Sequence, residues 1–128
     1  MIGDREKRVE KKTHKDLDVW KKSLDLAEMI YNITKKFPQE EKFLLVDQLR
    51  RAAVSIPSNI AEGASRNSKK EFMQFLFIAL GSLSELETQL LLSRRFGYLS
   101  DSNGSILNEA DQIRRMIIGL IKSIRARG

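Results

Sequence analysis

The sequence contains no cysteine and a single histidine, His14. The missing thiols exclude disulfides, zinc–thiolate sites and cysteine nucleophiles. One histidine cannot build a multi-histidine metal centre or most acid–base triads. The chain also has no Glu-x-x-His pair, although a di-iron helical bundle needs such pairs on facing helices. We therefore expect no enzyme activity, no metal, no cofactor and no small-molecule substrate.

Long hydrophobic runs are lacking as well. The longest unbroken apolar run, Phe75 to Leu80, is far shorter than the roughly 20 residues that a membrane-spanning helix needs. The N-terminus is charged and no apolar stretch follows it, so no signal peptide is predicted. These absences lead us to expect a cytoplasmic protein that does not associate with membranes.

Proline is rare and glycine is sparse within the periodic stretches, so long helices can form. Apolar spacing predicts helices over about Leu17–Lys36, from Pro38 past Ala64, from Ser68 to a glycine C-cap at Gly97, and from residues 100–105 to about Ala126. Short connections make neighbouring helices antiparallel. The expected fold class is all-α, an antiparallel up-down four-helix bundle spanning residues 17–128, and residues 1–16 are expected to form a flexible charged arm.

Pro57 lies inside the second predicted helix. Because proline has no amide hydrogen and crowds the preceding turn, we expect this helix to be kinked or broken there. Asn59 and Glu62 have the spacing of a new N-cap that would restart the helix. A kink at this polar cluster can mark a binding site, but a structural bend whose freed carbonyl accepts from a nearby hydroxyl is favoured.

The sequence has 23 lysines and arginines and 17 aspartates and glutamates, giving a net charge of +6. From residue 114 onward the chain has five basic residues and no acidic one: Arg114, Arg115, Lys122, Arg125 and Arg127. Such a tail attracts phosphate backbones. Cations also suit the negative C-terminal end of a helix dipole, so helix stabilisation is the alternative.

The apolar faces of the first and third predicted helices are wider than one bundle core requires. We therefore expect a homo-oligomer, with a monomer carrying an exposed apolar patch as the alternative. The candidate interface residues are Leu26, Ile30, Ile33, Met73, Phe77 and Ile78.

Two polar residues, Asn59 and Glu87, fall on apolar stripes. A buried carboxylate needs a partner, and Arg50 or Arg51 is the expected partner of Glu87. The predicted set of internal polar pairing residues is Arg50, Arg51, Asn59, Glu62 and Glu87. A catalytic or metal-binding role for Glu62, Glu85 and Glu87 is the disfavoured alternative, because the matching ligands are missing.

Six motifs stand in a specific order between Leu17 and Leu99, within a resemblance that covers roughly Leu17 to Ile124. They are Leu17-x-Val19-Trp20, Ile30-Tyr31-x-x-Thr34-x-x-Phe37-Pro38, Gln48-Leu49-Arg50-Arg51-Ala52-Ala53-x-Ser55-Ile56, Asn59-Ile60-Ala61-Glu62-Gly63, Gly81-Ser82-Leu83-x-Glu85-Leu86-Glu87-Thr88-Gln89-Leu90 and Gly97-Tyr98-Leu99. Together they closely resemble the bacterial proteins encoded within intervening sequences of 23S rRNA genes, a family also labelled S23 ribosomal protein. The N-terminal arm is not part of the family pattern.

This resemblance implies a four-helix bundle that assembles into a homopentamer. It also implies a distant relationship to the accessory proteins of diversity-generating retroelements, which are basic pentamers that bind nucleic acid. For Arg50, Arg51, Asn59, Glu62 and Glu87 it implies mainly packing and assembly. The leading functional hypothesis is binding of RNA or a ribonucleoprotein through the basic fourth helix. The alternatives are a protein-interaction scaffold without nucleic acid and, less favoured, association with a membrane surface.

Overall fold

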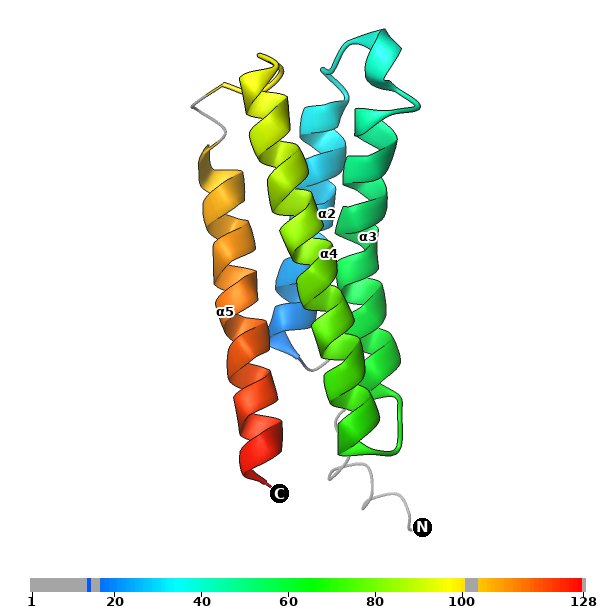
Figure 1. Ribbon diagram of the computed structural model, residues 1–128, viewed down its shortest axis with the longest axis vertical. Helices are drawn as coiled ribbons and strands as arrows, with labels where there is room; N and C mark the ends of the chain where they lie inside the picture. Colours follow the sequence, from blue (N-terminus) through cyan, green and yellow to red (C-terminus); the bar gives the residue numbers. More distant parts are fainter. Residues whose placement is uncertain (1–13, 15–16, 101–103, 128) are drawn as a thin grey trace.

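The computed structural model describes residues 14, 17–100 and 104–127. The described residues form four α-helices, in the order α2 (Asp18–Thr34), α3 (Leu45–Ala64), α4 (Lys69–Arg95) and α5 (Gly104–Ala126). A short 3-10 helix, η2 (Gln39–Glu41), joins α2 to α3. Successive helices run in opposite directions along one long axis (Figure 1). No strand occurs in the described ranges, so the predicted all-α, up-down four-helix bundle is confirmed.

Each helix packs against two neighbours in the ring order α2, α3, α4 and α5, with α5 closing back onto α2. The most extensive packing is between α3 and α4. The centre is filled by fully buried aliphatic side chains from every helix, including Leu26, Ile30, Leu49, Ile56, Leu83, Leu86, Ile113 and Ile117. Burial of this apolar surface is the main stabilising term of the fold.

Gly63 brings the last turns of α3 close to the first turns of α4. A Cβ atom built on Gly63 would lie 2.7 Å from the Cβ of Phe75 and 3.0 Å from Cδ1 of Phe72. Only a residue without a side chain allows this approach. The glycine therefore sets the spacing of the two helices at the end where α4 begins.

The second helix departs from the sequence prediction at both proline positions. Pro38 does not open α3; it precedes η2, and α3 begins only at Leu45. Pro57 lies inside an unbroken helix, so the predicted break is wrong, and a kink stays a prediction. Asn59 does not start a new helix.

Two side chains of α3 donate to backbone carbonyls near the proline. The Ser58 hydroxyl donates to the carbonyl of Val54 at 2.8 Å, and the Asn59 amide donates to the carbonyl of Ser55 at 2.8 Å. Ile56 and Ile60 on either side are fully buried. Packing of these residues against the core holds the helix together where propensity alone predicts a break.

The predicted ends of the third helix are confirmed. The Ser68 side chain accepts a hydrogen bond from the Glu71 amide at 3.1 Å, which caps the start of α4. Gly97 has a φ of +85°, the left-handed conformation that glycine adopts without strain. Just beyond it, the Tyr98 hydroxyl donates to Glu41 at 2.7 Å, and this hydrogen bond raises the pKa of Tyr98 above its ordinary value.

Glu87 pairs with Arg114 and not with Arg50 or Arg51, so the predicted partner is wrong. The ion pair joins α4 to α5, and the two side chains are 24% and 27% exposed. Arg114 also donates to the Ser84 hydroxyl at 3.3 Å. Sequence could not assign this partner, because residues 87 and 114 meet only through the antiparallel packing of α4 on α5.

We expect Gly63→Ala to destabilise the fold by about 1–3 kcal/mol, because the added methyl group overpacks the contact with Phe72 and Phe75. Gly119→Ala is the matched control, since a Cβ at this helical position meets nothing within 4 Å. It should stabilise the helix by up to about 1 kcal/mol. Urea denaturation measures both changes, and equal effects would contradict the assigned role of Gly63.

We expect Glu87→Gln to lower the free energy of unfolding by about 1–3 kcal/mol, because it leaves the partly buried Arg114 without a carboxylate. Asp111→Asn is the isosteric control, since Asp111 pairs with the 80% exposed Arg115 on the surface of α5. Its effect should stay within about 0.5 kcal/mol. Chemical denaturation at neutral pH distinguishes the two, and an unchanged Glu87→Gln variant would refute a structural role for this pair.

Candidate nucleic-acid interface

Cations from two helices gather at one end of the bundle. Because α4 and α5 are antiparallel, the first turn of α4 lies at the same end as the last turns of α5 (Figure 1). The Nζ of Lys69 donates to the backbone carbonyl of Arg127 at 3.3 Å, which joins the two segments directly. We call this region the basic end, and its residues are Lys69, Lys70, Lys122, Arg125 and Arg127.

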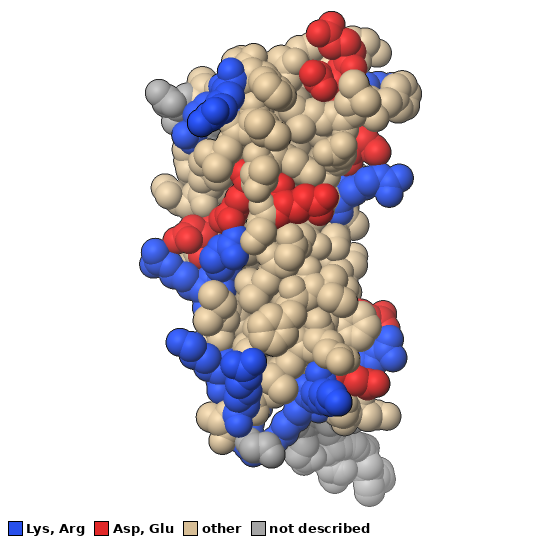
Figure 2. All heavy atoms as spheres, viewed as in Figure 1, with Lys and Arg blue, Asp and Glu red and all other residues tan. Residues whose placement is uncertain are grey.

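The basic end carries largely uncompensated charge. All five side chains belong to exposed residues, and none forms a salt bridge to another residue in the described part of the chain. Glu71 is the acidic residue in the first turn of α4. Figure 2 shows Lys and Arg side chains grouped at this end, with acidic side chains at its right edge and at mid-height. A surface of this charge attracts anionic polymers.

The structure separates the predicted nucleic-acid-binding residues into two groups. Lys122, Arg125 and Arg127 belong to the basic end. Arg114 is held by Glu87, and Arg115 pairs with Asp111 at 2.9 Å. The charges of these two arginines are neutralised within the subunit, so they contribute little to the basic end.

Sequence reasoning missed Lys69 and Lys70 as part of this surface. Both residues lie in the capping segment of α4, where the sequence shows only a helix start. The predicted antiparallel packing could have revealed them, because it places the start of the third helix beside the end of the fourth, where the C-terminal cations lie.

The remaining internal polar pairing residues are not brought together. Each has a separate partner outside the predicted set: Arg50 donates to Thr34, Arg51 pairs with Asp47, Asn59 donates to Ser55, and Glu62 pairs with Arg66. The structure therefore shows no shared network among Arg50, Arg51, Asn59, Glu62 and Glu87.

The predicted oligomer-interface residues have different positions in the subunit. Leu26 and Ile30 are fully buried in its own core, so their assignment to an interface is wrong. Ile33 and Met73 are half-buried. Phe77 and Ile78 are 48% and 50% exposed on α4.

These two side chains belong to a continuous exposed face of α4. Its residues recur every three or four positions, as one side of a helix requires. We call this surface the α4 outer face, and it comprises Gln74, Phe77, Ile78, Gly81, Glu85, Thr88 and Leu92. Glu85 is its one charged member.

α4 is also long and apolar enough to cross a membrane when judged by length and composition alone, and 33% of its most apolar window is buried in the bundle. Elsewhere in the described residues no helix meets this test. The described residues also hold no group of three or more His, Asp or Glu side chains that could bind a metal ion.

Comparison with known proteins identifies the family. The family model for the 23S rRNA-intervening sequence protein matches residues 15–119. A crystal structure from Bacteroides thetaiotaomicron, described as a protein of unknown function from the S23 ribosomal protein family, is similar with a TM-score of 0.75 and 35% sequence identity. The similarity covers 81% of this chain and 95% of that one. No curated protein matches. The chain therefore belongs to the 23S rRNA-intervening sequence protein family.

Proposed function

We propose that this protein is a non-catalytic, cytoplasmic homo-oligomer that binds RNA or a ribonucleoprotein through its basic end. The observation that carries the proposal is the grouping of five exposed cations from two helices without salt-bridge partners in the described chain. Lysine and arginine side chains of this kind contact phosphates and release counterions. Such contacts recognise charge and shape more than base sequence.

The α4 outer face supports the oligomer. Gly81 lies in the middle of this exposed face, and a Cβ there would meet nothing within 4 Å in the subunit. A glycine in a helix interior costs about 1 kcal/mol relative to alanine. Because Gly81 has no side chain, a helix from a second copy can approach the α4 backbone closely at this position. Such packing would give the glycine a function. The flanking Phe77 and Ile78 would then be covered.

The number of subunits comes from the family resemblance, which implies a pentamer. In a pentamer the basic end is repeated on every subunit. Repetition matters because linked weak sites bind one polymer far more tightly than a single site does.

A protein-interaction scaffold without RNA binding is the second candidate. The exposed apolar side chains of the α4 outer face favour it, because such a surface also suits a protein partner. RNA binding by the purified protein separates these two functions.

We expect the purified protein to have a pentameric mass in size-exclusion chromatography with light scattering. Gly81→Gln should shift it towards the monomer, because the added side chain blocks the close approach. Gly119→Gln is the control, as Gly119 is likewise exposed, helical and open to solvent, and it should keep the wild-type mass. A monomeric wild type, or equal masses for both variants, would contradict the proposed interface.

We expect the double variant Lys122→Gln with Arg125→Gln to weaken binding of single-stranded RNA at least about tenfold at low salt. The slope of log K against log salt should become shallower by about 1.4, because two phosphate contacts are lost. The charge-matched control is Arg94→Gln with Arg95→Gln, which removes two exposed cations from the far end of α4. Fluorescence anisotropy measures both.

Equal losses in the two double variants would contradict the basic end as the RNA site. Oligomers that fail to bind RNA at any salt concentration would favour the scaffold. In either case the light-scattering result remains an independent test of assembly.

A further inference from the structure

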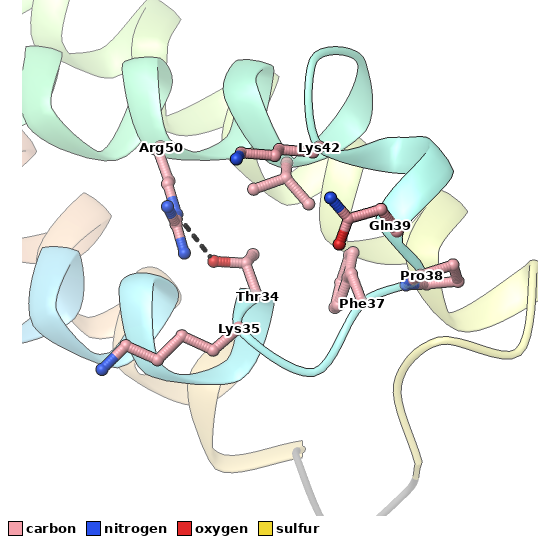
Figure 3. A pocket seen from close by; sticks show the side chains of 8 residues that line it. Thr34, Lys35, Phe37, Pro38, Gln39, Lys42 and Arg50 are labelled. Carbon is pink, nitrogen blue, oxygen red and sulfur yellow. Dashed lines mark hydrogen bonds between the residues drawn. The ribbon is translucent and has the colours of Figure 1, made fainter.

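A second polar site lies at the opposite end of the bundle from the basic end. A pocket of about 190 Å³ opens between the end of α2, η2 and the start of α3 (Figure 3). Its volume is several times the roughly 30 Å³ that one water molecule occupies in the liquid. The pocket is lined by Thr34, Lys35, Phe37, Pro38, Gln39, Lys42, Val46 and Arg50.

Arg50 is fixed in position at this pocket. Its Nε donates to the Thr34 hydroxyl at 2.9 Å, and the Thr34 residue is only 3% exposed. Its Nη2 donates to the Tyr31 carbonyl at 3.3 Å, and the guanidinium carbon lies 4.4 Å from the centre of the Tyr31 ring. Nη1 has no hydrogen-bond partner in the described chain. The guanidinium is therefore held in place with donors still available, which reduces the entropy lost when a ligand binds.

The pocket gathers positive charge without a matching carboxylate. In Figure 3 the Lys42 side chain extends towards Arg50, and the Gln39 amide lies between Lys42 and Phe37; the Lys35 ammonium points away. None of the lining residues is acidic. The apolar floor comes from Phe37 and Val46, which are 8% and 6% exposed.

Three carboxylates lie on the adjoining segments, those of Glu40, Glu41 and Asp47, and two of them have other partners. Asp47 pairs with Arg51 at 3.0 Å, and Glu41 accepts the Tyr98 hydroxyl at 2.7 Å. Lys42 and Arg50 both line the pocket, and each cation also contacts an aromatic ring: the Lys42 ammonium lies 5.4 Å from the centre of the Phe43 ring. An anion bound in the pocket would be attracted by both cations.

We propose that this pocket binds a phosphate group. The guanidinium offers a planar set of donors that matches phosphate oxygens, and Lys42 supplies a second positive charge. The Gln39 amide adds a neutral donor. The phosphate can belong to an RNA backbone or to a free phosphorylated molecule, since both present the same oxygens. The site does not depend on the basic end, which lies at the other end of the molecule.

The test is a titration of the full-length protein with inorganic phosphate, followed by NMR of the backbone amides and the arginine Nε–Hε groups. Sodium chloride at equal ionic strength is the reference. We expect phosphate-specific shifts at Gln39, Lys42 and Arg50. Lys42→Gln should weaken phosphate binding about fivefold or more, corresponding to one lost charged contact. Lys36→Gln is the matched control, because Lys36 is an exposed neighbour that does not line the pocket, and its affinity should stay within twofold.

Arg50→Lys provides a second variant that keeps the charge but loses the planar donor set. It should weaken phosphate binding as well, while a thermal melt and the NMR spectrum report whether the fold is retained. If both Lys42→Gln and Lys36→Gln weaken binding equally, the proposal is overturned.

A second titration with single-stranded RNA identifies the source of the phosphate. RNA that shifts the same three residues points to a backbone phosphate, and inorganic phosphate that RNA cannot displace points to a free phosphorylated molecule. Absence of specific shifts with both ligands would overturn the proposal. The variant Lys122→Gln with Arg125→Gln keeps this pocket, so its failure to bind RNA would concern the basic end alone.

Discussion

The close packing of α3 on α4 at Gly63 is the contact on which the placement of the other elements depends. The backbone of α3 lies directly against Phe72 and Phe75 there, so the direction and spacing of α4 are fixed at its start. The Glu87–Arg114 pair then joins α5 to α4 further along. These two contacts align the last turns of α5 with the first turn of α4, and the basic end is a consequence of that alignment.

The arginines and lysines of this protein have two kinds of environment. Arg114, Arg115 and Arg51 are neutralised by carboxylates of the same subunit. The basic end and the pocket at Arg50 lack such partners in the described residues. A cation in an ion pair is already neutralised by its partner, so it is less able to bind an anionic ligand. A net charge of +6 therefore says less about binding than the positions of the cations that no carboxylate neutralises.

α4 carries two apolar surfaces in different environments. Its inner side, with Leu83 and Leu86, is fully buried in the subunit. The α4 outer face leaves Phe77 and Ile78 about half exposed and places Gly81 where nothing in the subunit touches it. This double apolarity explains why α4 has the composition of a membrane-spanning helix although it packs within a bundle. The proposed packing of a second copy on the outer face would account for both the hydropathy and the glycine.

The sequence by itself determined the features that depend on neighbouring residues. Four helices, the Ser68 cap and the left-handed Gly97 follow from local hydrogen bonding and backbone preference, and the structure has them all. It did not determine contacts between distant segments. The apolar periodicity placed Leu26 and Ile30 on an apolar helix face. It could not show whether this face packs in the subunit core or at an interface, because both environments bury apolar side chains. The partner of Glu87, the continuity of α3 through Pro57 and the meeting of Lys69 with Arg127 were decided only by tertiary packing, which brings together residues that are far apart in the chain and can outweigh local preference.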